Sequence, residues 1–162
     1  MYIAYSNQRD FHIYFDNLVD EICEERIPGW KNMKNDPRPQ KEWVKAPYLP
    51  ESTWQWDNAA NISWLHSSEF HELHILFCAN DKNYLKLEIC GHDENLDLTY
   101  ENLGRWQLSD ELMFSDEFVK DIIRAYCSTG NKDEIIAKFN TIIGNANKYK
   151  PNTEIINQFR RR

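Results

Sequence analysis

The amino-acid sequence predicts a single α+β domain in which one helix precedes an antiparallel sheet and two or three helices follow it. Three patterns carry this prediction: an apolar helical face near the start, alternating apolar runs in the middle, and two capped helical faces toward the end. The chain has 162 residues, which is the size of one domain. We therefore expect residues 1–162 to fold as one globular unit.

The first helix is predicted to begin near Ser6 and to end before Pro28-Gly29. Its apolar residues recur at i, i+4, i+7 and i+11, the spacing that brings side chains onto one helical face. They are Phe11, Phe15, Leu18 and Ile22. The acidic residues of this segment lie mostly on the other face, so one side of the helix is expected to pack on the core.

A Pro/Trp-rich segment follows, from residue 28 to residue 61. It holds five of the six prolines and four of the six tryptophans in the chain. Because proline disrupts helix interiors and sheets, we expect an irregular loop with at most one short element, around residues 41–46. Disordered segments are poor in aromatic residues, which favours an ordered loop. Its tryptophans either anchor the loop on the core or form an exposed aromatic surface; they are Trp30, Trp43, Trp54 and Trp56.

The sheet is expected to span about residues 62–100. Residues 70–78 and 84–90 alternate apolar and polar side chains, and the turn-forming residues 80–83 between them predict a β-hairpin with a four-residue loop. Two shorter strand-like runs flank this hairpin, at residues 64–65 and 96–100. The simplest arrangement is an antiparallel meander of three or four strands.

Helices are predicted after the sheet. Ser115 is placed to cap a helix whose apolar face runs to Tyr126, and Asn131 is placed to cap the next helix, which ends at Gly144. Pro151 lies near the start of a last short helix. These segments are the two or three C-terminal helices of the predicted fold.

No residue pattern predicts catalysis. Motifs of nucleophilic hydrolases, metalloproteases and nucleotide-binding loops do not occur, and five glycines are too few for a glycine-rich phosphate loop. His71 and His74 would point to opposite faces of a strand and so could not share a metal ion. The four cysteines are scattered singly, although Cys78 and Cys90 could face each other across the hairpin. We therefore expect no enzymatic activity, no metal and no cofactor.

The chain is expected to be cytoplasmic. No apolar run approaches the roughly 20 residues of a membrane span, so no membrane association is expected. The first 15 residues lack the basic and apolar regions of a secretory signal. In a cytosolic protein, scattered cysteines behave as small buried apolar residues.

The acidic residues indicate a basic partner. The chain carries 26 acidic and 19 basic residues, and residues 88–121 alone hold ten acidic residues against two basic ones. Such a surface disfavours direct binding of nucleic acid and attracts a positively charged protein. The expected contact residues are Asp93, Glu94, Asp97, Glu101, Asp110 and Glu111, with Trp106 as an aromatic anchor among them.

In general character the chain resembles the immunity proteins of bacterial contact-dependent growth inhibition and related polymorphic toxin systems. The resemblance lies in the mixed α+β pattern, in the segments Trp54–Trp56 and Gly104–Trp106, and in the acidic stretch Gly91–Asp121. It implies a cytoplasmic protein that binds the toxin domain of its own system and blocks the toxin's active site or substrate access. A basic nuclease is the class of toxin that we expect.

Two other functions stay open at the level of sequence. The Trp-rich loop could hold a small ligand or a carbohydrate by stacking, and the acidic surface could mimic DNA in an antidefence protein. A DNA mimic is expected to be more uniformly acidic than this chain, which ends in Arg160, Arg161 and Arg162. An immunity protein that inhibits a basic toxin domain is therefore the function that the sequence favours.

Overall fold

The fold is a five-stranded antiparallel sheet with helices before and after it. The structure is a computed structural model and describes residues 8–33, 50–55, 59–68, 71–79, 82–129 and 131–160. The strands, which lie side by side in chain order, are β1 (Pro50–Gln55), β2 (Ala59–Ser68), β3 (His71–Ala79), β4 (Asn83–His92) and β5 (Leu98–Gln107). The helices are α1 (Gln8–Arg26), α2 (Trp30–Met33), α4 (Asp110–Met113), α5 (Asp116–Cys127), α6 (Lys132–Gly144), a 3-10 turn (Ala146–Lys148) and α7 (Thr153–Arg160). This arrangement confirms the predicted single α+β domain.

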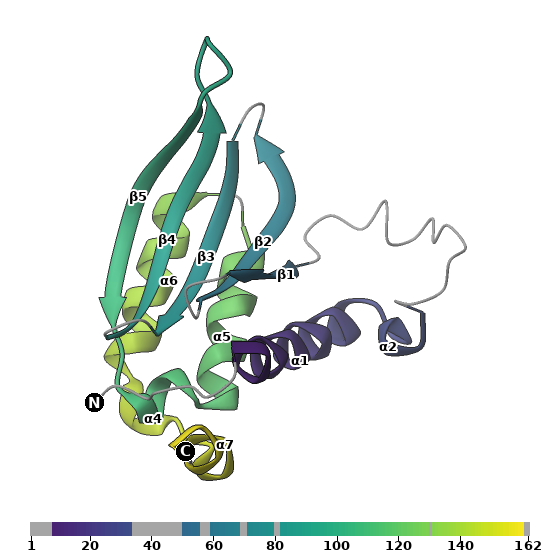
Figure 1. Cartoon of the computed structure of the whole chain (residues 1–162), viewed down its shortest axis with the longest axis vertical. Helices are drawn as coiled ribbons and strands as arrows, with labels where there is room; N and C mark the ends of the chain where they lie inside the picture. The colour runs from purple at the N-terminus through teal and green to yellow at the C-terminus, as the bar shows by residue number, and fades with distance from the viewer. Residues whose placement is uncertain are drawn as a thin grey trace.

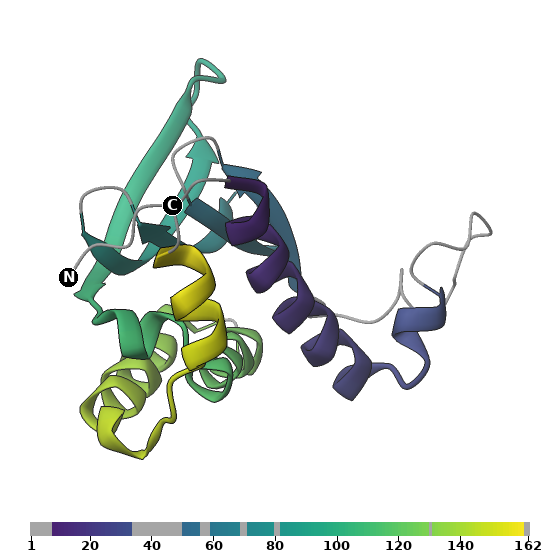
Figure 2. The same cartoon turned by 60° about the horizontal axis from the view of Figure 1, so that its bottom comes forward.

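The helices cover one face of the sheet. Figure 1 shows α5 and α6 behind the strands, and Figure 2 shows the helices gathered on one side. Phe77 of β3 stacks on Phe15 of α1, with ring centroids 4.9 Å apart, and Trp106 of β5 meets Phe139 of α6 edge to face. Among the described residues, no helix lies over the opposite face of β3, β4 and β5 (Figure 1). We call this second face the open face.

The core lies between the covered face of the sheet and the helices. The helical spacing of apolar residues in α1 and their alternation in β3 and β4 predict this location. Alternate residues of β3 and β4 point to the helices and are fully buried; they are Ile75, Phe77, Leu85 and Leu87. The predicted apolar face of α1 is buried as well, at Phe11, Phe15, Leu18 and Ile22. The residues between the buried ones in β3 and β4 point to the open face.

The C-terminal helices confirm the prediction, with one change at a cap. The Asn131 side chain accepts hydrogen bonds from the backbone N–H groups of Asp133 (2.9 Å) and Glu134 (3.1 Å) and so caps α6. Ser115 precedes α5, but its hydroxyl donates to the backbone oxygen of Lys150 instead (2.8 Å). Ser115 therefore ties the start of α5 to the segment before α7. Ser6, the predicted cap of the first helix, lies outside the described residues.

The sheet is larger than predicted at both ends. Strand β1, the start of β2 and the short α2 all lie in the segment 28–61, which was predicted to be an irregular loop. Pro50 is the first residue of β1, which lies at the edge of the sheet, and both the first position of a strand and an edge strand tolerate proline. At the other edge β5 continues to Gln107, well past residue 100, because an exposed edge strand shows little apolar alternation. The predicted element at residues 41–46 lies outside the described residues.

The β3–β4 hairpin has a shorter connection than the predicted four-residue loop. Ala79 pairs with Asn83, so three residues join the strands. The fully buried residues of both strands, among them Ile75, Phe77, Leu85 and Leu87, carry odd numbers, and an antiparallel register must match odd with odd to keep them on one face. This register also separates Cys78 from Cys90, although the sequence left open that they face each other across the hairpin. Cys78 pairs with Tyr84 at one end of the hairpin, whereas Cys90 lies near the other end.

Within the described part of the chain, no helix combines the length and the apolar character that crossing a membrane requires.

Candidate functional site

The β4–β5 hairpin projects beyond the helices at one end of the molecule (Figure 1). His92 pairs with Leu98, and a five-residue loop, 93–97, connects them. Every residue from 93 to 102 is exposed, on both faces of the hairpin. We call residues 93–101 the hairpin tip.

Hydrogen bonds within the loop hold the tip in one shape. The backbone N–H of Asp93 donates to the Asp97 oxygen (2.9 Å), and the Leu96 N–H donates to the Asp93 oxygen (3.0 Å). The Asp93 carboxylate accepts from the backbone N–H groups of Asn95 (2.8 Å) and Asp97 (3.0 Å). Leu96 has a φ of 65°, in the left-handed region that a leucine rarely adopts. The turn thus places an apolar side chain at the end of the hairpin.

The tip carries exposed apolar side chains. The exposed fractions are 81% for Leu96, 61% for Leu98 and 65% for Tyr100. Among the described residues only one other large apolar side chain, Ile13 of α1, is exposed. Leu98 and Tyr100 are two residues apart on β5 and so share one face, the open face. Exposed apolar groups that cluster in this way mark a surface for contact with another molecule.

Four of the predicted contact acids lie together on this tip. Asp93, Glu94 and Asp97 are in the loop, and Glu101 is on β5. Residues 91–101 contain no lysine or arginine. Glu111 is exposed too, but it lies in α4, at the opposite end of the sheet (Figure 1). The structure therefore places four of the expected acids together and separates Glu111 from them.

Asp110 and Trp106, two of the predicted contact residues, lie within the fold and so do not belong to the candidate surface. Asp110 is only 1% exposed, and the Asn83 side-chain amide donates to it at 2.5 Å. The Trp106 indole N–H donates to the Asn140 side-chain oxygen (2.8 Å), which joins β5 to α6. Its ring lies on Gly104, where an added Cβ would come within 2.5 Å of a ring carbon. Both side chains hold the base of the β4–β5 hairpin on the helices.

Two acidic residues of α1, Glu21 and Glu25, have partners inside the molecule. Glu21 pairs with Lys120 of α5 at 3.2 Å, and Glu25 pairs with Arg124. Hydrogen bonds from Arg124 lower the pKa of Glu25, and the same contact raises the pKa of Arg124. These acids join α1 to α5. The acidic hairpin tip is thus the better candidate for an external partner.

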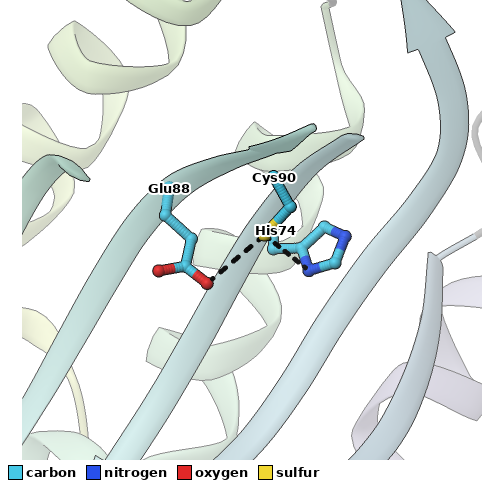
Figure 3. A group of neighbouring side chains, drawn as sticks. All are labelled: His74, Glu88 and Cys90. Atoms are coloured by element: carbon cyan, nitrogen blue, oxygen red, sulfur yellow. Dashed lines mark hydrogen bonds between the residues drawn. The ribbon is translucent and has the colours of Figure 1, made fainter. Parts of the chain in front are cut away.

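A second group of polar side chains lies on the open face. His74 of β3 is the direct cross-strand partner of Glu88 of β4, and Cys90 follows Glu88 on the same face. The Cys90 Sγ lies 3.9 Å from His74 Nδ1 and 3.6 Å from Glu88 Oε1, between the two (Figure 3). Lys86 binds the other carboxylate oxygen of Glu88 at 3.0 Å. We call His74, Glu88 and Cys90 the open-face cluster.

The order of groups in this cluster differs from that of a catalytic triad. In a triad the imidazole stands between the nucleophile and the carboxylate, so that it takes the proton and is oriented from behind. Here the sulfur stands between the imidazole and the carboxylate. All three ligand-type atoms lie within 4.8 Å of one another, which is instead a spacing that a metal ion could bridge.

Residue order alone does not reveal this cluster, because its members lie on two different strands. The partner of His74 is on the next strand, and only the hairpin register reveals it. The side chains of His66, His71 and His92 lie outside the described residues, and so do those of Trp43, Trp54 and Trp56, on which the carbohydrate-binding alternative depends.

No family model, curated protein or solved structure matches this chain.

Proposed function

We propose that this chain is an immunity protein that binds a basic toxin domain, with a nuclease as the expected class, and blocks its active site or substrate access. The observation that carries this proposal is the hairpin tip, which combines exposed apolar side chains with four acidic residues. The tip also projects beyond the helices, so it can enter a cleft that the rest of the molecule cannot (Figure 1).

The apolar side chains of the tip supply affinity. Full burial of a leucine side chain contributes roughly 1.5–3 kcal/mol, and aromatic residues are among the most frequent dominant contacts in protein interfaces. Leu98 and Tyr100 offer this area on one face of β5, and Leu96 offers it at the end of the loop. A DNA mimic requires an array of charges and does not require exposed leucines. The hairpin tip therefore favours an inhibitor of a toxin domain over a DNA mimic.

The acids supply attraction to a basic cleft. Nucleases bind a polyanion, so their substrate sites are lined with lysine and arginine. Glu94, Asp97 and Glu101 present negative charge where that substrate would bind, and complementary charge raises the association rate. Asp93 contributes charge and also fixes the turn through its backbone contacts.

The hydrogen-bonded loop reduces the entropic cost of binding. A loop that is already ordered in the free protein loses less conformational freedom when it docks. The left-handed Leu96 is held by its neighbours in the conformation that exposes its side chain.

A growth-protection assay with a matched binding assay tests the proposal. The reading frames next to this chain's gene are first searched for a toxin domain, and that domain is the probe. Growth protection and affinity are then measured for the wild type, for Leu98→Ser/Tyr100→Ser and for Ile13→Ser. We expect the hairpin variant to lose protection and affinity, whereas the Ile13 variant keeps both. Equal protection by all three proteins would overturn the proposed surface, and a wild type that binds no such domain would overturn the function.

A further inference from the structure

We propose that the open-face cluster is a binding site for a zinc-class transition-metal ion, with His74 Nδ1, Glu88 Oε1 and Cys90 Sγ as ligands. This inference departs from the expectation of a protein without metal. It stands on the register of β3 and β4 and does not depend on the proposed inhibitor function.

The geometry is close to that of a tetrahedral site. Zinc bonds of about 2.0–2.3 Å at tetrahedral angles place neighbouring ligand atoms about 3.3–3.6 Å apart. The sulfur already lies 3.6 Å from the Glu88 oxygen and 3.9 Å from the His74 nitrogen. All three ligand atoms lie within 4.8 Å of one another, so the imidazole and the carboxylate must rotate toward a shared point beside the sulfur to close the site. The two strands that carry them are paired along their whole length, which fixes the backbone positions.

The ligand types select the metal. Thiolate and imidazole favour zinc and similar transition metals, whereas calcium and magnesium prefer sites made only of oxygen. Three protein ligands leave one position of a tetrahedral ion open, as in exchangeable or catalytic sites and unlike closed structural ones. A metal at this position is therefore expected to retain a water molecule or to accept a ligand from outside.

Cys90 is the suitable cysteine of the four. It is half-buried, whereas Cys23, Cys78 and Cys127 are buried. Burial raises the pKa of Cys78 to about 11 and that of Cys127 to about 12, so these thiols resist the deprotonation that metal binding requires. Cys78 is on the same hairpin as Cys90 but near its other end.

Lys86 defines which oxygen of Glu88 binds the metal. Its ammonium group contacts Oε2 at 3.0 Å, so Oε1 is the atom that points toward the sulfur (Figure 3). Contacts of this kind to the far atom of a ligand orient the ligand. Tyr100, the cross-strand partner of Cys90, belongs to the hairpin tip, so the cluster borders the surface proposed for the partner.

Metal titration of the untagged full-length protein tests the site. The reduced protein is treated with a chelator and then titrated with zinc alone, in competition with a chromogenic chelator. Cobalt is added in a parallel experiment to report the ligands. We expect one ion per chain, and a cobalt spectrum with intense tetrahedral bands in the visible range and a thiolate charge-transfer band in the near ultraviolet.

Three ligand variants and one control assign the site. Cys90→Ser, Glu88→Gln and His74→Ala should each weaken zinc binding by about tenfold or more, because even residues behind a ligand change metal affinity about 10–100-fold. Cys90→Ser should also remove the charge-transfer band. Cys78→Ala removes a thiol from the same hairpin and should change neither result. Circular dichroism of the metal-free variants verifies that each one folds.

The outcomes that overturn the site are specific. They are the absence of stoichiometric zinc binding, a cobalt spectrum without thiolate character, or a loss of affinity in Cys78→Ala equal to that in Cys90→Ser. Full affinity in Glu88→Gln, the most conservative variant, also overturns it. Leu98→Ser/Tyr100→Ser should bind zinc as the wild type does, so failure of the inhibitor proposal and failure of the metal site are distinguishable.

Discussion

The base and the tip of the β4–β5 hairpin use similar residues in opposite ways. At the base, Trp106 packs on Phe139 and the Asp110 carboxylate is buried against Asn83. At the tip, Tyr100 and Asp97 are exposed. The difference lies in what is beneath them, because α6 supports the base and the tip extends past the helices (Figure 1). An aromatic or acidic residue therefore serves stability where a helix covers it and stays available for binding where none does.

The largest expected effect is at the base. Trp106→Ala should lower the free energy of unfolding by about 3 kcal/mol, because it removes a half-buried ring and its contact with α6. Urea unfolding measures this change. Trp106→Phe keeps an aromatic ring but loses the hydrogen bond to Asn140, so it should cost only about 1 kcal/mol.

The folded Trp106→Ala protein should still bind the partner. If it keeps wild-type stability but loses partner affinity, Trp106 belongs to the interface after all, as the sequence first predicted. Gly104→Ala tests the same contact from the strand, since its Cβ would collide with the ring and should destabilise the protein by about 1–3 kcal/mol.

The next effect is at the tip. Leu98→Ala/Tyr100→Ala should weaken partner binding about 100-fold, which corresponds to about 2.7 kcal/mol. The free energy of unfolding should change by less than about 0.5 kcal/mol, because both side chains are exposed. Affinity measurement and urea unfolding on the same samples check both parts. A large loss of stability would show that the tip is part of the core, and the comparison of tip and base would then fail.

Charge at the tip should act mainly on the rate of association. Reversal of Glu94, Asp97 and Glu101 to lysine should slow association about tenfold at low salt and flatten its dependence on salt. Stopped-flow mixing at several salt concentrations measures both. Glu111→Lys is the matched control, because Glu111 is an exposed acid at the far end of the sheet. If Glu111→Lys slows association as much as the tip reversals do, net charge rather than the tip controls the encounter.

The fold could be predicted where periodicity is strong. The apolar faces of α1 and α5 repeat with the helical period, and β3 and β4 alternate with period two, so these elements follow from residue order alone. Strand β5 could not be delimited, because it is an edge strand and its tip is exposed on both faces. Strand β1 could not be predicted, because the prolines around it indicate an irregular segment, although the edge of a sheet tolerates them.

The candidate sites required knowledge of what lies next to each residue. Composition grouped Asp110 with the tip acids, and only the packing shows that it is buried. The open-face cluster could almost have been predicted from the sequence. The fully buried residues of both strands are odd-numbered, so they share one face only if an odd number of residues connects the strands. Three residues place His74 opposite Glu88, whereas the predicted four would have put the buried residues of the two strands on different faces.

The smallest expected effect concerns acids that are engaged within the fold. Arg124 lowers the pKa of Glu25 below its ordinary value of 4.5. A carboxyl group whose pKa is lower in the folded state stabilises the protein above its unfolded pKa, and that contribution is lost as the pH falls through the folded pKa. Because the pair is at the surface, Glu25→Gln should cost only about 0.5 kcal/mol at pH 7. The difference between variant and wild type should shrink to zero as the solution is acidified below pH 4.5.

Glu94→Gln at the tip is the control. The Glu94 carboxylate makes no ion pair with any described residue, so this variant should leave the free energy of unfolding unchanged at every pH. Urea unfolding over this pH range decides the matter, and a Glu25→Gln difference that persists in acid would mean that packing, not charge, joins α1 to α5 at this point.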